Sequence, residues 1–482
     1  MKIQFIIAGI IAATALLNAA DTKRPNIVLM YADDMGYGEV QALNPERGKI
    51  PTPNLDKLIT EGMTFTDAHT ASSVCTPSRY ALLTGRYAWR TRLQTGVLTG
   101  AGEPLIAENR LTLAKMLKER GYSTAISGKW HLDFHYDGPR ATVGTTIPDG
   151  PITRGFDTWL GFHHARSMKE LCKDDKIIEI IDPIEMLPRT TDFAVDYINK
   201  KAADAKNGKP FFLYVPFGSP HTPILPTEEW IGKSGLGKYG DFVMMTDGMA
   251  GRVIDSIDAN GLGDNTIIIF SSDNGTSRKC KFDHLKEQGH YPSAYLRGSK
   301  ADLWDGGHRV PFILRWSNGG VKPGSRCNQL IGLSDMTATV ADIIGYELPD
   351  NAAEDSISFL PAIRGKQIMS EREAIVHHSI SGHFAIRKGK WKLLLASGSG
   401  GWTKPVHTTD GPQVQLYDMS KDLNEQNNLQ AEFPEVVFEL TKLLESYVAN
   451  GRSSSGPAMK NDAEIDIWKR DSGKKKTAKK KS

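Results

Sequence analysis

The sequence contains little cysteine: four residues in 482, namely Cys75, Cys172, Cys280 and Cys327. None of them forms a CxxC pair or stands at a zinc-ligand spacing, which excludes a disulfide-rich scaffold and a zinc finger. A large charge excess is also absent, because 59 Lys and Arg face 56 Asp and Glu and give a formal net charge of +3. We therefore expect no nucleic acid as a partner.

Long apolar runs are absent after residue 20, so we expect no transmembrane segment in the mature chain. The first residues have a charged start at Lys2, an apolar run from Phe5 to Leu17 and a small-residue end at Ala19-Ala20. This is the pattern of a secretory signal peptide, and the run is short for a spanning helix. We therefore expect residues 1–20 to be a signal peptide and the protein to be exported to the periplasm or the extracellular space.

The remaining length is too great for one small core and fits a large α/β domain with a smaller companion. Lysine crowds the C-terminal end, at Lys474, Lys475, Lys476, Lys479, Lys480 and Lys481. Apolar residues are few from Gly451 on, which predicts a disordered basic tail over 451–482. A tether to an acidic polymer is the alternative role for these lysines.

Apolar, β-rich runs alternate with helical patterns along the body. We expect strands over 25–31, 122–127, 210–215 and 266–272, and helices near 52–62, 111–117 and 239–257. This alternation predicts a large, mostly parallel central sheet with helices on both faces. After Arg364-Gly365 the pattern changes to a hairpin around Lys388-Gly389, a strand at 416–419 and a helix at 434–448.

Polar side chains gather where the predicted strands end. They are Asp33 and Asp34, Lys129 and His131, and Asp273 and Asn274. In open α/β sheets, ligands bind at the carboxyl ends of the strands. Adjacent carboxylates repel each other and would ordinarily turn to solvent, but before a glycine turn they could converge on a hard cation. Lysine and histidine two residues apart on an extended segment point the same way, so both could reach one anion.

The run Cys75-Thr76-Pro77-Ser78-Arg79 stands at the start of a predicted helix, and Thr84-Gly85-Arg86 follows it. A cysteine at a helix start with an arginine one turn later places a sulfur and a fixed guanidinium at the positive end of the helix, which suits an anion. An isolated cysteine here would be a buried structural thiol before a helix that Pro77 starts. The complete run, however, resembles the signature of the formylglycine-dependent (type I) sulfatases.

Other segments extend this resemblance. Gly128-Lys129-Trp130-His131-Leu132, Pro220-His221-Thr222-Pro223 and the run from Gly298 to Pro311, which contains Lys300, are similar to motifs of that family. The last run departs from the family at Asp305, where glutamate is commoner and a structural role is expected. The similarity covers about Pro25 to Leu429. It implies an alkaline-phosphatase-like α/β fold, with a catalytic domain over 21–365 and a smaller α+β subdomain over 366–450 built on an antiparallel sheet.

The resemblance also implies a chemistry. In this family a maturation enzyme oxidises the cysteine to formylglycine (3-oxoalanine), whose hydrate attacks sulfur and can later collapse back to the aldehyde. The implied catalytic residues are Cys75, Arg79, Lys129, His131, His221 and Lys300. The implied metal is one Ca2+ on Asp33, Asp34, Cys75, Asp273 and Asn274. Arg79 would hold the aldehyde hydrate and the neighbouring charges in place. His221 or Lys300 would protonate the leaving oxygen, and His131 would help to regenerate the aldehyde. The expected modifying partner is a formylglycine-generating enzyme or an anaerobic sulfatase-maturating enzyme.

These features predict a secreted, bacterial-type, arylsulfatase-like hydrolase that removes sulfate from carbohydrates, as in polysaccharide degradation. A small aryl-sulfate hydrolase is one alternative. A phosphoryl-transfer enzyme of the same superfamily would need zinc ligands and a serine or threonine nucleophile, and a non-catalytic glycan-binding relative would have lost part of the site. With Cys75 converted, three cysteines remain and allow at most one disulfide. His163 and His164 are at least as readily surface histidines as substrate contacts.

Overall fold

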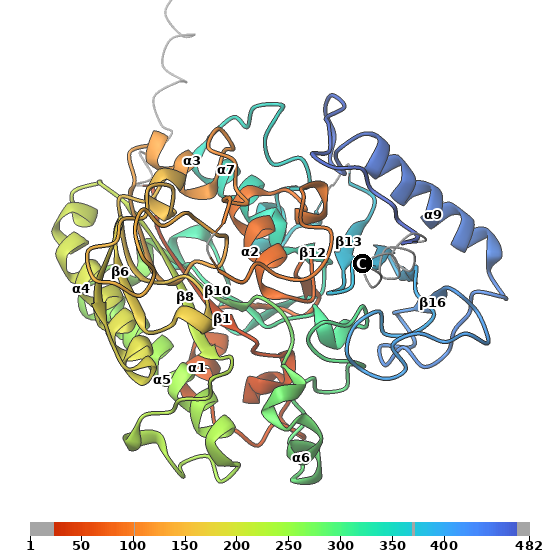
Figure 1. Cartoon of the computed structure of the whole chain (residues 1–482), viewed down its shortest axis with the longest axis horizontal. Coiled ribbons are helices and arrows are strands. Elements are labelled where there is room, and N and C mark those ends of the chain that lie inside the picture. The colour runs from red at the N-terminus through yellow and green to blue at the C-terminus, as the bar shows by residue number, and fades with distance from the viewer. Residues whose placement is uncertain (1–23, 101, 369–371, 470–482) are drawn as a thin grey trace, which may run out of the picture.

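The computed structural model of the chain describes residues 24–100, 102–368 and 372–469. The predicted signal peptide and the C-terminal lysine cluster lie outside these residues. Within the described part, the centre is a ten-stranded sheet with the order β11-β2-β10-β9-β1-β8-β4-β5-β6-β7 (Figure 1). Its strands are β1 (Asn26–Asp33), β2 (Met63–Phe65), β4 (Ser123–Lys129), β5 (Thr158–Phe162), β6 (Glu170–Lys173), β7 (Lys176–Ile180), β8 (Phe211–Pro220), β9 (Thr266–Ser272), β10 (Phe312–Arg315) and β11 (Ser325–Cys327).

The middle of this sheet is parallel, which confirms the prediction. β9, β1, β8, β4 and β5 pair in parallel in that order, whereas β10, β6 and β7 pair antiparallel with their neighbours. All residues of β1, β8 and β9 are buried, because helices cover both faces. The apolar run of β10 fits a strand of either direction, so its antiparallel pairing does not follow from the sequence pattern.

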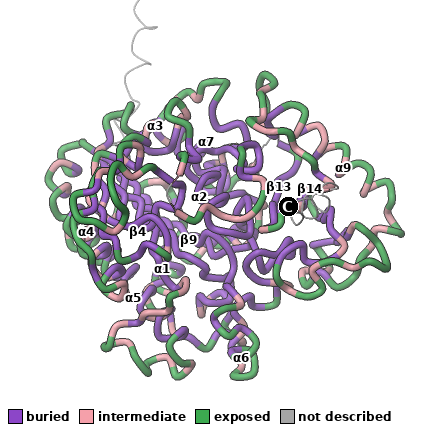
Figure 2. The backbone as a smooth tube through the Cα atoms, viewed as in Figure 1, coloured by how far each residue is buried: buried purple, intermediate pink, exposed green. Residues whose placement is uncertain are grey.

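Two layers of helices cover the sheet, and alternate residues of β1 face them. Ile27 and Leu29 belong to one hydrophobic core, with side chains of α2, α3 and α7, and Val28 and Met30 belong to another, with side chains of α1, α4 and α5 (Figure 1). The helices are α1 (Pro53–Glu61), α2 (Cys75–Thr84), α3 (Leu113–Glu119), α4 (Met186–Lys206), α5 (Gly237–Ala259), α6 (Phe282–Glu287), α7 (Met336–Ile344) and α8 (Leu360–Ile363). Figure 2 shows the central strands as buried backbone, with exposed residues in the outer helices and loops.

The C-terminal part forms a smaller unit beside the main sheet. β13 (Ile375–His378), β14 (Phe384–Lys388), β15 (Trp391–Leu394) and β16 (Gln415–Asp418) make an antiparallel sheet that α9 (Pro434–Ala449) packs against. A two-stranded sheet of β3 (Ala68–His69) and β12 (Ile331–Gly332) lies in the main domain. Trp89 of the main domain packs on Phe384, with ring centroids 5.3 Å apart, so the two units share a core.

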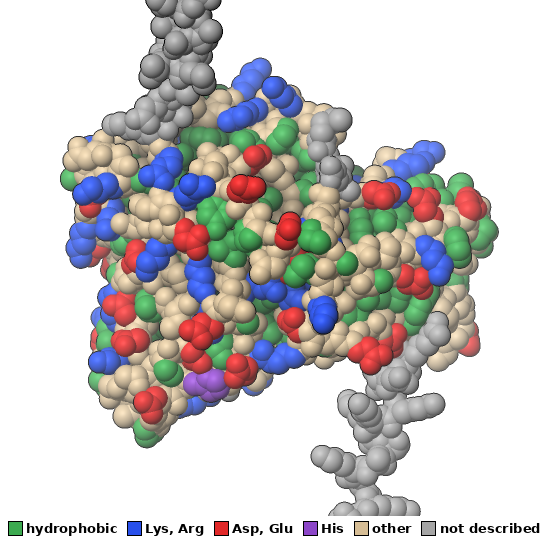
Figure 3. Space-filling model, turned by 90° about the horizontal axis from the view of Figure 1, so that it is seen from above, with side chains coloured by type: hydrophobic (Ala, Val, Ile, Leu, Met, Phe, Trp, Pro, Cys, Tyr) green, Lys and Arg blue, Asp and Glu red, His purple; other side chains and the backbone are tan. Residues whose placement is uncertain are grey.

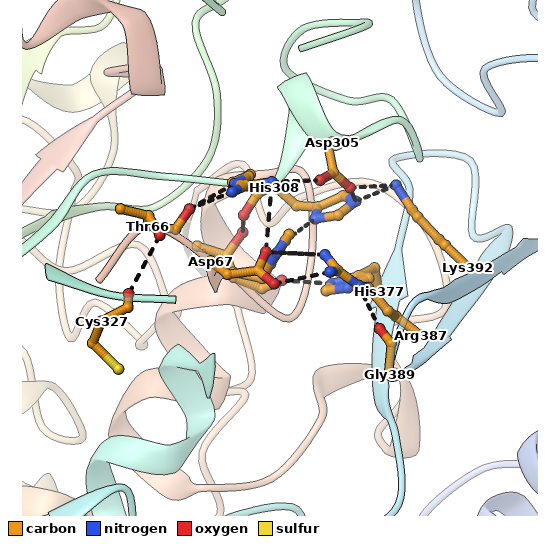
Figure 4. A network of polar contacts seen from close by, with 12 residues as sticks. Thr66, Asp67, Asp305, His308, Cys327, His377, Arg387, Gly389 and Lys392 are labelled. Atoms are coloured by element: carbon orange, nitrogen blue, oxygen red, sulfur yellow. Dashed lines mark hydrogen bonds and ion pairs between the residues drawn. The ribbon is translucent and has the colours of Figure 1, made fainter. Parts of the chain in front are cut away.

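A buried polar network also joins the two units (Figure 4). Lys392 on β15 donates to Asp305 Oδ1 at 2.7 Å and to Glu425 Oε1 at 2.8 Å, and all three side chains are completely buried. Arg387 on β14 pairs with Asp67 of the main domain at 2.8 Å. Asp305 therefore serves to bind the C-terminal unit.

Three histidines lie beside this network, and their ring nitrogens are close together: His69, His308 and His377. The rings of His308 and His377 stack, with centroids 3.8 Å apart and planes 12° apart. Their in-plane lone pairs therefore cannot point at one ion. In addition, the Lys392 ammonium lies 3.2 Å from His308 Nε2. This group is better described as part of the hydrogen-bonded network than as a metal site.

Lys392→Met is expected to destabilise the protein by about 3–5 kcal/mol, because the change leaves two buried carboxylates without their cation. Urea unfolding followed by tryptophan fluorescence measures the effect. Lys388→Met is the matched control, since Lys388 pairs with Glu373 and Glu439 at the surface. Its cost should stay below about 1 kcal/mol. Equal destabilisation by the two variants would show that burying the ion pair does not increase its contribution to the free energy of unfolding.

Residues 451–469 correct the prediction of a disordered tail that begins at Gly451. Arg86 Nη1 lies 2.9 Å from Asp462 Oδ2, and Arg90 Nη1 donates to Asn461 Oδ1 at 2.9 Å. Ile467 is buried. The prediction was wrong because a low apolar content says nothing about polar contacts to arginines of the main domain. This segment is therefore packed on the main domain.

All four cysteines lie in the described residues, and each is a free thiol. Among the same residues, no helix combines the length and the apolar character that a membrane span requires. Lys and Arg side chains are interspersed with Asp and Glu on the face seen in Figure 3. The stability of the described part therefore rests on packing and buried polar contacts, with no disulfide in it.

Candidate active site

The ends of β1 and β9 bring four oxygen-bearing side chains together. Asp34 follows β1 with a φ of 67°, a left-handed conformation that aspartate tolerates better than most residues. Its N–H donates to Asp273 Oδ1 at 3.0 Å, and Asn274 Nδ2 donates to Asp34 Oδ1 at 2.8 Å. Asp33, the last residue of β1, completes the group. These side chains meet at the sheet edge where the sequence analysis placed them, and their role as metal ligands stays a prediction.

Cys75 is the first residue of α2, and its thiol lies against these carboxylates. Sγ is 3.3 Å from Asp33 Oδ1 and 3.7 Å from Asp34 Oδ1, and the residue is 2% exposed. Burial and the nearby Asp273 and Asp33 carboxylates raise the pKa of the thiol well above its ordinary value. The thiol therefore keeps its proton at neutral pH and is a weak nucleophile in this form.

Arg79 lies one turn later in α2 and faces the carboxylates. Its Nε and Nη2 donate to Asp273 Oδ2 at 3.1 and 2.7 Å, and Nη2 lies 3.5 Å from Asp33 Oδ1. Its Nη1 is buried and has no hydrogen-bond partner among the described residues. The expected role of Arg79 was to hold the aldehyde hydrate and the neighbouring charges, and its observed contacts hold one of those charges, Asp273, in place. The free Nη1 is the part of the guanidinium left for another acceptor.

Two lysines complete the charge pattern. Lys129, the last residue of β4, donates from Nζ to Asp33 Oδ2 at 2.5 Å. Lys300 Nζ contacts Asp34 Oδ1 and lies 3.3 Å from Cys75 Sγ. Burial disfavours the charge on Lys300, but the Asp34 carboxylate outweighs this and raises the pKa of the ammonium. The three cations of the cluster thus face its three carboxylates.

His221 and His131 present different ring nitrogens toward their surroundings. His221 Nδ1 donates to the Thr222 carbonyl, which leaves Nε2 at 3.7 Å from Asp34 Oδ2. His131 Nε2 donates to the Leu98 carbonyl at 2.8 Å, so Nδ1 is left as a buried acceptor without a partner among the described residues. His221 is therefore part of the cluster, and His131 offers a lone pair beside it.

The extended geometry assumed for Lys129 and His131 is wrong. β4 ends at Lys129, and His131 has a φ of 59°, so the alternation of a strand does not extend to His131 and cannot set the direction of its side chain. In the described residues His131 makes no hydrogen bond to Asp33, Asp34 or Cys75. Burial and the Lys129 ammonium lower the pKa of His131 well below its ordinary value. The structure thus places His131 next to the cluster rather than within it.

The cluster has the composition of a site for a hard cation. Asp33, Asp34, Cys75 and His221 offer ligand atoms that all lie within 4.8 Å of one another. Asn274 Oδ1 is buried and has no hydrogen-bond partner among the described residues. A buried acceptor without a donor is unfavourable unless a cation or a water molecule meets it. These residues therefore fit a divalent cation that prefers oxygen ligands, with His221 as a neighbour that the sequence analysis gave another role.

Two histidines that the sequence left unassigned also lie here. His163 and His164 follow β5 and are 1% and 8% exposed, so the surface alternative is wrong for both. The His164 ring centroid is 4.5 Å from that of His131. Their position after a strand end was the only signal in the sequence, because a pair of histidines carries no sign of burial.

The chain is similar to known proteins in both sequence and structure. Residues 25–346 match the family model described as Sulfatase. The chain is 34% identical over 491 residues to an N-acetylgalactosamine-6-O-sulfatase of Bacteroides thetaiotaomicron, with 89% of this chain and 94% of that protein covered. It is 30% identical over 455 residues to arylsulfatase A of Homo sapiens, with 85% and 84% covered. A solved structure named as a 6S-sulf protein, from work on glycosaminoglycan metabolism by Bacteroides thetaiotaomicron, superposes with a TM-score of 0.77 at 30% identity, over 88% of this chain and 99% of that one.

Proposed function

Because this chain belongs to the sulfatase family and is therefore a sulfuric ester hydrolase, we propose that it removes O-sulfate groups from carbohydrates by means of a formylglycine made from Cys75 and a bound Ca2+. The family membership and the structural relatives also confirm the alkaline-phosphatase-like fold that the sequence resemblance implied. Family membership supports a catalytic role for the cluster, and both that role and the assignment of each residue to a step are our proposal.

The observation that carries the proposal is the position of Cys75. Its side chain stands at the head of α2, between two carboxylates of the cluster and the Lys300 ammonium. The charges of the three carboxylates and three cations cancel, so a divalent cation would leave the site positive and attractive to a sulfate ester. In its hydrated aldehyde form, residue 75 would carry two hydroxyl oxygens. One would attack sulfur while the bond between sulfur and the sugar oxygen breaks, and it would leave as part of the sulfate when the other hydroxyl loses its proton and forms the aldehyde again.

The chain's own residues divide the remaining tasks. Lys129 and Lys300 lie at the cluster and can neutralise sulfate oxygens. Lys300, whose ammonium carries protons, can deliver one to the leaving oxygen, and His221 can do so from Nε2 only in its imidazolium form, because in the neutral ring the proton is on Nδ1. His131 Nδ1, a buried acceptor, can take a proton when the aldehyde is regenerated. Asp33, Asp34, Asp273 and Asn274, with residue 75, would hold the Ca2+.

The substrate class rests on the relatives. The chain resembles an N-acetylgalactosamine-6-O-sulfatase over nearly its whole length, so a sulfated amino sugar, free or within a polysaccharide, is the first candidate. Arylsulfatase A is a relative of somewhat lower identity, which keeps a small aryl sulfate as the second candidate. The cluster alone does not distinguish the two, because it contacts the sulfate that they share.

Export and maturation complete the proposal. The pattern of residues 1–20 supports export to the periplasm or the extracellular space. Conversion of Cys75 requires a partner, a formylglycine-generating enzyme or an anaerobic sulfatase-maturating enzyme.

A screen of defined sulfated mono- and disaccharides tests the proposed function, with free sulfate measured by ion chromatography. We expect release from N-acetylgalactosamine 6-sulfate by protein produced together with a maturation enzyme. The 4-sulfated isomer, 4-nitrophenyl sulfate and a phosphate monoester are run in parallel. Turnover of the aryl sulfate alone would favour the second candidate, and faster release of phosphate than of sulfate would contradict the proposal.

A further inference from the structure

His164 borders the cluster, and in the described residues it makes no hydrogen bond to Asp33, Asp34 or Cys75. It follows β5, whose parallel pairing with β4 puts the ends of both strands at the same sheet edge. Its ring centroid lies 4.5 Å from that of His131. The Lys129 ammonium and the Asp33 carboxylate are near enough to act on the ring electrostatically. His164 therefore belongs to the surroundings of the reacting groups.

Hydrogen bonds within the segment fix the tautomer and the position of the ring. The Arg166 N–H donates to His164 Nδ1 at 3.0 Å, so in the neutral ring the proton is on Nε2. The His164 N–H donates to Ser167 Oγ at 3.2 Å, and the Ser167 hydroxyl donates to the His164 carbonyl at 3.1 Å. The orientation of this ring thus does not depend on a bound ligand.

The Nε2–H donor has no partner in the described part of the chain. It makes no hydrogen bond there and is not sealed from solvent, and the residue is 8% exposed. Burial and the Lys129 ammonium lower the pKa of His164 to about 3, so the ring stays neutral at the pH of most assays. A fixed, neutral donor without a partner in the described residues, on a side chain that is buried but not fully sealed, is available to a ligand at this edge.

We propose that His164 is a substrate-binding residue that donates from Nε2 to an uncharged oxygen of the sugar, a hydroxyl or an amide carbonyl next to the sulfated position. This proposal rests on the proposed function. The sulfate finds charged donors in Lys129 and Lys300, whereas a neutral donor suits an uncharged oxygen. His131 cannot take this role, because its Nε2–H already serves the Leu98 carbonyl. His164 would thus help the enzyme to favour a sulfated sugar over an aryl sulfate.

The test compares kcat/KM for a sulfated N-acetylhexosamine with kcat/KM for 4-nitrophenyl sulfate, which has neither a ring hydroxyl nor an amide. His164→Ala is expected to lower the ratio of the two values about tenfold, the effect of one lost hydrogen bond. His164→Gln keeps an N–H donor at a similar reach and should recover part of the ratio. Ser167→Ala loosens the segment but keeps the ring, so it should change the ratio less than about twofold.

The outcomes separate this proposal from the proposed function. An equal loss on both substrates in His164→Ala, with an unchanged ratio, would assign the residue to structure and overturn the proposal. If the unaltered protein turned over neither substrate, the proposed function would fail. In that case, calorimetric titration of the same variants with the sulfated sugar would still test the contact. Weaker binding by His164→Ala but not by Ser167→Ala would support it, and binding by His164→Ala equal to that of the unaltered protein would refute it. Thermal unfolding of each variant shows that it is folded.

Discussion

Cys75→Ala is expected to abolish sulfate release, with a loss on the order of 10^4-fold or more, because the change removes the group proposed to become the nucleophile. The fold should persist, since a small buried side chain at the start of a helix contributes little to the free energy of unfolding. Activity is measured as free sulfate from the best substrate of the screen, and folding by circular dichroism.

Cys327→Ala is the matched control for this variant. It removes another buried, free thiol, at the end of β11 on the outer strand of the sheet, and should leave turnover close to that of the parent protein. Mass spectrometry of the tryptic peptide Leu58–Arg79 should in addition show the aldehyde in place of the thiol after expression with a maturation enzyme. Undiminished turnover by Cys75→Ala would remove the basis of the proposed mechanism.

Removal of divalent cations is expected to lower turnover by about 10^3-fold, since a metal ion at a developing charge is worth several kcal/mol. The physical reason is that sulfate oxygens would then meet Asp33, Asp34 and Asp273 without a metal to screen them. Exhaustive dialysis against a chelator, followed by activity measurement, gives the size of the effect.

Readdition of metal identifies the ion. Calcium should restore activity better than zinc, because the cluster is rich in oxygen ligands. Asn274→Ala should raise the calcium concentration needed for half-maximal activity, since Asn274 Oδ1 is the buried acceptor without a partner. Asn44→Ala is the control for a lost buried asparagine, because within the described part of the chain its side chain bonds only backbone carbonyls. Rescue by zinc alone would favour the phosphoryl-transfer alternative.

Much of the fold follows from the sequence for a simple reason. The apolar runs at β1 and β9 are wholly buried, and strands of this kind need little context to be identified. Parallel strands in turn place Asp33, Asp34, Asp273 and Asn274 at one edge, so the convergence of these side chains could be predicted. This part of the site can be predicted because each of its side chains lies at the end of a strand that is recognisable from its own residues.

Other parts depend on contacts between distant segments or on single dihedral angles. The pairing of Arg79 with Asp273 joins residues 194 positions apart, and the positive φ of His131 breaks the alternation assumed for a strand. The burial of His164 and the packing of residues 451–469 likewise arise from the surrounding fold. Composition and periodicity describe one segment at a time. These features arise from contacts between segments or from single dihedral angles, so they could not be predicted in this way.

The burial of Cys75 also fixes an order of events during biogenesis. A side chain that is 2% exposed at the base of a charged cluster offers no room for the active site of a second enzyme. Any enzyme that modifies Cys75 must therefore reach it while the nascent chain is still unfolded. The contacts of segment 451–469 to Arg86 and Arg90, just beyond α2, cannot form before residues 461 and 462 have been synthesised, so the packing around this part of the chain is completed late. Purified, folded protein that carries the thiol should accordingly resist conversion, whatever amount of modifying enzyme is added.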